Sequence, residues 1–157
     1  WLKGVLSAMD DVDSIVELFC GSGNFTHVLA ETSAAHIVAL EGDDASIAAL
    51  TARGLRGVTG VRANLFSESD IRTLVPNVNG RLGVVMDPPR EGLKERAALT
   101  TLFSSARWVV YIACDLATWE RDSGFLSDCG LSLQEARGLD MFPQTPHMEI
   151  LSVFKRA

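Results

Sequence analysis

The stretch that decides the fold is Ser14-Ile15-Val16-Glu17-Leu18-Phe19-Cys20-Gly21-Ser22-Gly23-Asn24. Its first half, Ser14–Phe19, is a short apolar run, which predicts a buried strand that stops at a Gly-rich turn. A helix is predicted directly after the turn, from Phe25 to Glu31. The order strand, Gly-rich turn, helix is typical of α/β domains, in which ligands bind at the carboxyl ends of the strands.

The same alternation of strand and helix continues along the chain. Further strands are predicted over residues 37–40, 58–61, 82–86 and 108–112, and helices over 1–9, 45–52, 67–74, 94–105 and 118–129. Residues 131–139 and 150–154 are expected to form a closing pair of strands. Continuous apolar strands between helices indicate a mostly parallel sheet that is covered on both faces.

Length and charge limit what the chain can be. Its 157 residues, of which 47% are hydrophobic, fit one domain, 1–157, with a full core. The net charge of -6 weighs against a domain that grips nucleic acid alone, because phosphate binding needs a basic face. No apolar run reaches the roughly 18 residues that indicate a membrane span. The first residues form no signal peptide, and no Met begins the chain, which suggests a piece of a longer protein.

The cysteines indicate a reducing compartment. Cys20, Cys114 and Cys129 are odd in number and far apart, so they predict neither a disulfide framework nor a zinc site. No metal is predicted, and a cytoplasmic location is expected because free thiols persist in reducing surroundings.

The Gly-rich turn is the candidate cofactor site. Gly21 and Gly23 would let the backbone approach a ligand closely, and Glu41, at the end of the second predicted strand, could bind two ribose hydroxyls. Dinucleotide and S-adenosylmethionine sites share this pairing. The dinucleotide fingerprint requires a third Gly where this chain has Thr26, which favours S-adenosylmethionine. The alternatives are a plain tight turn and a solvated charge at Glu41.

Three motifs in the second half supply candidate chemistry at strand ends. Asp87-Pro88-Pro89-Arg90 forms a turn stiffened by proline, Cys114 could be a nucleophile, and Glu149 could be a base. Each has a structural alternative: a rigid turn, a buried inert thiol and an edge-strand charge. His147 is expected to be structural or orienting rather than catalytic.

Together these stretches resemble the RNA (uracil-5-)-methyltransferase family, which makes 5-methyluridine in transfer or ribosomal RNA. The resemblance spans nearly the whole chain. Its most specific part is the string Asp140-Met141-Phe142-Pro143-Gln144-Thr145-Pro146-His147-Met148-Glu149. The spacing between this string and Cys114 is part of the same resemblance. The family fold implied is an α/β, Rossmann-like class I methyltransferase, with a mostly parallel seven-stranded sheet, helices on both faces and an antiparallel last strand.

The resemblance also implies roles. Cys114 would add to carbon 6 of uracil, and Glu149 would remove the carbon-5 proton after methyl transfer. The residues expected at the S-adenosylmethionine site are Phe19, Gly21, Gly23, Asn24, Glu41, Asn64 and Asp87. RNA would be the partner, gripped largely by N-terminal RNA-binding parts of the family that are absent here. No iron-sulfur cluster and no protein partner are predicted for this region.

The chain departs from the family beside the nucleophile. Asp115 and Leu116 stand where the family usually has Asn and Pro, and a carboxylate next to Cys114 would oppose the thiolate. Two rival functions therefore stay open. One is a catalytically impaired RNA-binding or assembly module that keeps the fold, and the other is a methyltransferase for a different target, such as a cytosine or a protein side chain.

Overall fold

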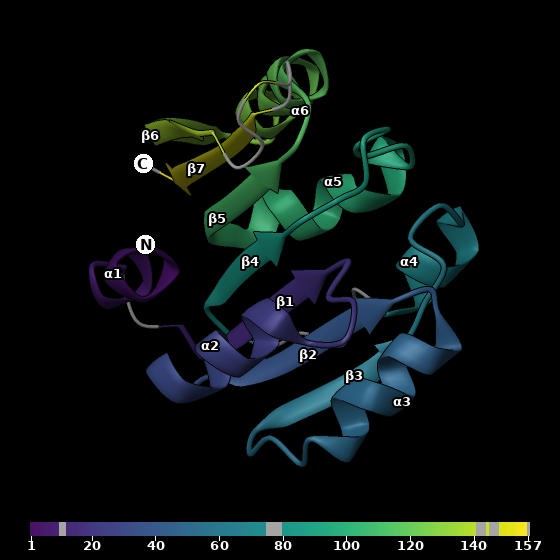
Figure 1. Ribbon diagram of the computed structural model, residues 1–157. Coiled ribbons are helices and arrows are strands. Elements are labelled where there is room, and N and C mark those ends of the chain that lie inside the picture. The colour runs from purple at the N-terminus through teal and green to yellow at the C-terminus, as the bar shows by residue number, and fades with distance from the viewer. Residues whose placement is uncertain (10–11, 75–79, 141–143, 145–147, 157) are drawn as a thin grey trace.

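The computed structural model describes residues 1–9, 12–74, 80–140, 144 and 148–156. Its strands are β1 (Ser14–Leu18), β2 (His36–Glu41), β3 (Val58–Arg62), β4 (Leu82–Met86), β5 (Ala106–Ala113), β6 (Leu131–Leu139) and β7 (Glu149–Arg156). They form one seven-stranded sheet in the order β3-β2-β1-β4-β5-β7-β6 (Figure 1). Strands β1 to β5 pair in parallel, whereas β7 runs antiparallel to both β5 and β6. The predicted fold class is therefore confirmed.

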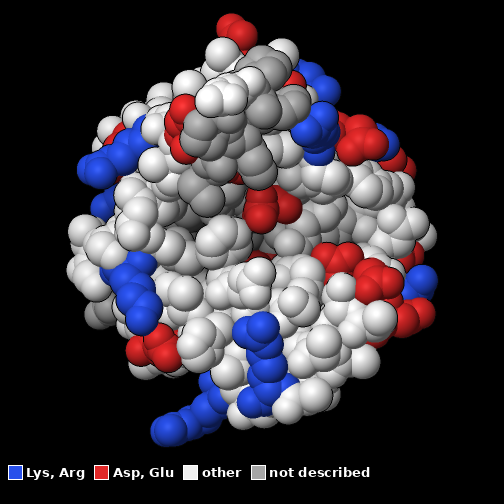
Figure 2. All heavy atoms as spheres, in the orientation of Figure 1, with Lys and Arg blue, Asp and Glu red and all other residues white. Residues whose placement is uncertain are grey.

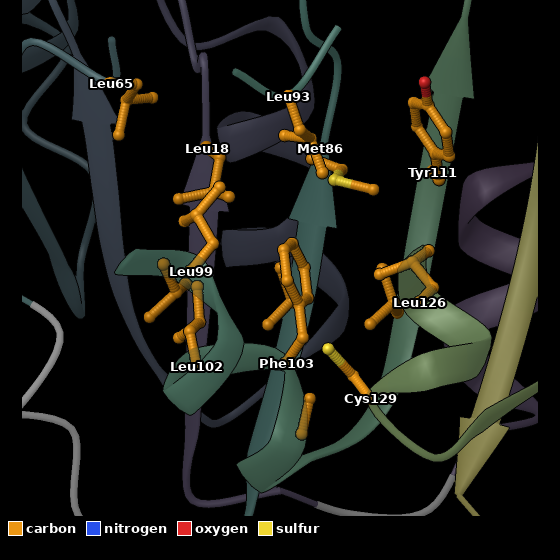
Figure 3. Close-up of a cluster of buried hydrophobic side chains, with 14 of the residues drawn as sticks. Leu18, Leu65, Met86, Leu93, Leu99, Leu102, Phe103, Tyr111, Leu126 and Cys129 are labelled. Atoms are coloured by element: carbon orange, nitrogen blue, oxygen red, sulfur yellow. The ribbon is translucent and has the colours of Figure 1, made fainter. Parts of the chain in front are cut away.

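The helices cover both faces of this sheet. They are α1 (Leu2–Ser7), α2 (Asn24–Thr32), α3 (Asp44–Ala52), α4 (Glu68–Leu74), α5 (Arg96–Ser105) and α6 (Leu116–Asp128). Buried residues of α1 and α2 pack on one face, and those of α4, α5 and α6 pack on the other. Figure 3 shows the second cluster, in which leucines and a phenylalanine of α5 meet side chains of β1, β4 and β5. Among the described residues, no helix has the length and apolar character needed to cross a membrane.

Two helices, α3 and α6, each begin at an aspartate whose carboxylate caps the helix, and the hydrophobic pattern alone does not predict these starts. The Asp43 carboxylate accepts the backbone N–H of Ser46 and caps the start of α3. The Asp115 carboxylate accepts the N–H of Thr118 in the same way. For this reason α6 starts at Leu116, two residues before the predicted start. Helix α5 begins at Arg96 rather than at the predicted residue 94.

Trp108 explains a glycine in the middle of a buried strand. The Trp108 side chain is almost fully buried and packs over Gly83 of the neighbouring β4. A Cβ at position 83 would clash with the indole ring. The glycine thus makes room for the largest side chain on this face of the sheet.

Candidate functional site

Four parallel strands deliver their last residues to one edge of the sheet. Strands β1, β2, β4 and β5 end at Leu18, Glu41, Met86 and Ala113, and the ladders place these ends side by side. The residues that follow include Phe19, Asp87 and Cys114. The strand ends that precede these predicted site residues therefore share one edge of the sheet.

The Gly-rich turn is tied to the end of β2 by Glu41. One carboxylate oxygen of Glu41 accepts the Gly21 N–H at 3.0 Å, and the other accepts the N–H groups of Gly42 and Asp43 at 2.7 and 3.0 Å. Gly21 and Gly23 have φ values of 52° and 89°, a region that glycine adopts without strain. Glu41 is therefore a bonded part of this loop and not a freely solvated charge.

Gly23 is also a packing position. A Cβ there would overlap the Leu50 side chain of α3, whereas a Cβ at Gly21 would meet nothing within 4 Å. The first glycine faces open space and the second lets the turn approach α3. The Arg53 guanidinium donates to the Gly23 carbonyl at 3.0 Å and holds the turn from the same side.

An aromatic pair flanks this loop. Phe19 has a φ of 62°, which is uncommon for a residue with a side chain and places its ring 5.8 Å from the Phe66 ring. Asn64 lies just before Phe66, and its side-chain oxygen accepts the Phe66 N–H at 3.0 Å. Asn24 is exposed in the first turn of α2. The described structure thus places Phe19 and Asn64 near one another through Phe66.

The candidate catalytic pair lies at the end of the β5–β7 ladder. The antiparallel register pairs Ala113 with Ile150, so Cys114 and Glu149 are the residues that adjoin the last pair of this ladder. Cys114 is half-buried and is a free thiol, as are Cys20 and Cys129, both of which are buried. Burial raises the pKa of Cys20 to about 12, which agrees with an inert role for that thiol.

Asp87 shares its surroundings with Glu149. Partial burial is the larger cause, and the negative charge of Glu149 the smaller, of a rise in the pKa of Asp87 to about 6. Part of the residue is nevertheless exposed. The Asp87 N–H also contacts the Leu18 carbonyl at 3.4 Å, which places the start of the Pro-containing turn beside β1. Asp87 therefore lies between the Gly-rich turn and Glu149.

A largely apolar cavity opens at this point. It has a volume of about 590 Å³, and its walls come from α1, α2 and the last strands: Trp1, Leu2, Lys3, Phe25, Val28, Asp87, Ile112, Leu139, Glu149 and Leu151. Figure 2 shows acidic side chains in the hollow at the centre of this face. Among the described residues the lining includes both carboxylates but not Cys114, which follows the end of β5 two residues after the lining residue Ile112.

Asp115 caps the start of helix α6, a role that the sequence alone did not predict. Its carboxylate accepts the Thr118 N–H at 2.8 Å, and this bond holds the pKa of Asp115 below its usual range. Asn and Asp are both good N-cap residues, and proline is favoured at the position that follows. Asp115 and Leu116 therefore stand at the cap and first position of α6, where the Asn and Pro of the resembling family would serve the same purpose.

Glu17 is a buried acid that the sequence analysis missed. It is 1% exposed, and one of its oxygens accepts the Thr26 hydroxyl at 2.6 Å while the other has no partner among the described residues. Burial, opposed by the Thr26 hydrogen bonds and reinforced by the charge of Asp87, raises the pKa of Glu17 to about 7. A carboxylate inside the otherwise apolar run Ile15–Leu18 was the available signal.

Part of the predicted site lies outside the described residues. Of the stretch 140–149, the described positions are Asp140, Gln144, Met148 and Glu149, so the prediction for His147 has no structural counterpart here. Among the residues that are described, no group of three or more His, Cys, Asp or Glu side chains could hold a metal ion.

Comparison with solved structures defines the class of fold. The chain matches the N-methyltransferase NodS from Bradyrhizobium japonicum with a TM-score of 0.73, at 15% identity, over 99% of this chain and 92% of that one. It also matches a putative RNA methyltransferase from Pyrococcus horikoshii with a TM-score of 0.71, at 14% identity, over 100% of this chain and 79% of the other. The fold is that of S-adenosylmethionine-dependent methyltransferases.

Relatives found by sequence define more closely which class of methyltransferase the chain resembles. The chain is 38% identical over 99% of its length to an uncharacterized RNA methyltransferase of Nitrosomonas europaea. It is 37% identical over 92% of its length to the 23S rRNA (uracil(1939)-C(5))-methyltransferase RlmD of Hahella chejuensis, and 40% identical over 92% to RlmD of Klebsiella pneumoniae. No family model matches. The resemblance to RNA (uracil-5-)-methyltransferases is confirmed, and the chain is homologous to one section of these proteins.

That section is the smaller part of each relative. The chain spans 40% of the Nitrosomonas protein and 33% of each of the two RlmD proteins. An activity of a whole relative can therefore be assigned to this chain only by inference.

Proposed function

We propose that this chain is the catalytic domain of an S-adenosylmethionine-dependent enzyme that methylates carbon 5 of a uridine in RNA. The observation that supports the proposal is that Cys114 and Glu149 adjoin the last pair of the β5–β7 ladder, and that the charge of Glu149 acts on Asp87, in a chain homologous to uracil-C5 methyltransferases. The relatives named for 23S rRNA favour ribosomal RNA as the substrate class. RNA would be held largely by parts of the protein outside this domain.

The residues present fit S-adenosylmethionine. The cofactor carries a positively charged sulfonium, and the cavity is lined by the carboxylates of Asp87 and Glu149. Behind them, inside β1, one oxygen of the buried Glu17 has no partner among the described residues. The open space at Gly21 leaves room for a ligand against the backbone, and Glu41 has lone pairs left to accept ribose hydroxyls. We assign cofactor contacts to Phe19, Gly21, Gly23, Asn24, Glu41, Asn64 and Asp87.

When bound, the cofactor supplies an electrophilic methyl group. Carbon 5 of uracil is a poor nucleophile, so Cys114 first adds as a thiolate to carbon 6, and the electron pair of the 5,6 double bond moves into an enolate. Carbon 5 of the enolate would accept that methyl group, the electron pair of the broken sulfur–methyl bond would stay with the cofactor as a neutral thioether, and Glu149 would then remove the proton on carbon 5. The electrons of that C–H bond restore the double bond and expel the Cys114 thiolate. General-base help of this kind is worth about a hundredfold to ten-thousandfold.

Trapping with a fluorinated substrate tests the covalent step. RNA that carries 5-fluorouridine has no carbon-5 proton for Glu149 to remove, so the full-length protein should accumulate a stable protein–RNA adduct. Cys114→Ala should abolish this adduct, whereas Cys129→Ala, a matched change at a buried thiol, should leave it. Mass spectrometry of the adduct peptide identifies the bonded residue.

Three outcomes separate the candidate functions. An adduct that persists in Cys114→Ala means that another residue is the nucleophile. Cofactor binding by calorimetry without any adduct or methyl transfer supports the impaired RNA-binding module. Methylated nucleosides other than 5-methyluridine in digested RNA, or methyl transfer to protein, support a different target.

A further inference from the structure

Asp122 is a fully buried acid that joins three elements behind the proposed site. It accepts the Leu93 N–H at 3.0 Å, the Arg96 guanidinium at 2.5 Å and the Tyr111 hydroxyl at 3.2 Å, and it pairs with Arg121 at 3.2 Å. Figure 3 shows Tyr111 on β5 with its hydroxyl turned away from the apolar cluster, toward the carboxyl end of the strand. A buried charge with four donors fixes the groups around it, because losing any of them leaves polar atoms unpaired.

The same face of α6 also grips the loop that follows the Pro-containing turn. The Thr118 hydroxyl donates to the Arg90 carbonyl at 2.9 Å, and the Arg121 guanidinium donates to the Glu91 carbonyl at 2.7 Å. Gly92, with a φ of 68°, lies so close to α6 that a Cβ there would clash with Thr118 and Arg121. Loop 90–93 is therefore held along its length by one helix.

A third tie connects α6 to the strands. The Trp119 indole N–H donates to the Ser152 hydroxyl at 3.0 Å, and that hydroxyl donates to the Tyr111 carbonyl at 3.0 Å. Ser152 lies opposite Tyr111 in the β5–β7 ladder that ends at Glu149. Helix α6 is thereby fixed to both strands that present the proposed nucleophile and base.

We propose that Thr118, Arg121 and Asp122 form a positioning clamp that sets the distance between Cys114 and the Asp87 loop. The proposal rests on the proposed function, and none of the three is assigned a contact with substrate. Cys114 lies directly before the cap of α6, and Asp87 lies three residues before Arg90, so a shift of α6 against loop 90–93 moves the thiol relative to Asp87. Misplacing reacting groups by about 1 Å can cost on the order of a hundredfold in rate.

Thr118 gives the sharpest test, because one hydroxyl can be removed without changing the shape of the side chain. Thr118→Val removes the bond to Arg90, and Thr118→Ser keeps it. Ser127→Ala is the matched control, because the partner of the Ser127 hydroxyl among the described residues is the Ser123 carbonyl of its own helix, at 3.0 Å. For each full-length variant, the rate of adduct formation with saturating 5-fluorouridine RNA, the cofactor dissociation constant and the Tm are measured.

We expect Thr118→Val to form the adduct at least about tenfold more slowly, in line with the cost of small misplacements, with an unchanged cofactor dissociation constant. Thr118→Ser should recover the rate, and Ser127→Ala should match wild type. A Thr118→Val rate within about twofold of wild type, in a protein that does form the adduct, overturns the clamp alone. A wild-type protein that forms no adduct overturns the proposed function and the clamp with it. Arg121→Met, which removes the bond to Glu91, repeats the test if Thr118→Val does not fold.

Discussion

The buried Glu17 predicts a specific dependence of stability on pH. Its pKa is raised from 4.5 to about 7 in the folded chain, chiefly by burial. A shift of this size corresponds to about 3 kcal/mol between the two protonation states. The folded protein binds the proton more tightly than the unfolded chain, so this stabilisation is complete below about pH 4.5 and is lost as the pH rises through about 7.

Glu17→Gln isolates this contribution. The glutamine carbonyl can still accept the Thr26 hydroxyl bond, but the side chain cannot ionise. The free energy of unfolding of wild type should therefore fall relative to that of Glu17→Gln by about 2 kcal/mol from about pH 5.5 to about pH 8.5. Asp87, whose pKa is also raised, is present in both proteins, so its direct titration largely cancels in the comparison.

Urea unfolding followed by tryptophan fluorescence measures this difference, because Trp108 is buried in the core and reports loss of the fold. Each protein is unfolded at a series of pH values and the two curves are subtracted. If the difference stays constant within about 0.5 kcal/mol across the range, the raised pKa of Glu17 is wrong. A difference with the opposite slope would mean that the folded chain stabilises the ionised form.

Three further predictions concern the start of helix α3, the packing of the sheet and the proposed cofactor site. Asp43→Ala should lower the free energy of unfolding by about 1 kcal/mol in urea unfolding, because helix α3 loses its N-cap and the Ser46 N–H loses its acceptor. Asp43→Asn should lower the free energy of unfolding by less, because asparagine is also a good N-cap residue. Gly83→Ala should cost about 1–3 kcal/mol by the same measurement, because its methyl group would displace the Trp108 ring; no loss would contradict that packing. Glu41→Gln should weaken S-adenosylmethionine binding about tenfold in calorimetry, since a bond to a charged group is worth roughly 1.5–3 kcal/mol; equal affinity would remove Glu41 from the site.

The order of elements was predictable from the sequence because the apolar runs are short, continuous and separated by glycine, proline or a cap residue. The run Leu82–Met86 is buried at every position, as a central parallel strand requires. Once the strands are parallel, their carboxyl ends share an edge, which is why the grouping of Phe19, Asp87 and Cys114 could be predicted without coordinates.

Side-chain partners were not predictable, because they depend on distances that the periodicity does not encode. Asp122 is one of three acidic residues in α6, and nothing in the local sequence indicates that it bonds Tyr111 and Leu93. Asp115 was expected to act on its neighbour Cys114, whereas the structure shows its carboxylate at the start of α6. Backbone donors at a helix start attract such a carboxylate, and a sequence motif does not show where that carboxylate points.

The charges of this domain suit its proposed cofactor better than its proposed substrate. Carboxylates at the strand ends attract a cationic sulfonium, but together with a net charge of -6 they repel an RNA backbone. A catalytic domain that must also hold RNA would need a basic face to offset this repulsion. The chain spans 40% or less of the relatives described above, so the parts of those relatives that have no counterpart in this chain could carry such a face. We therefore propose that the acidity at the sheet edge serves cofactor binding, and that a basic surface other than this edge binds the polyanion.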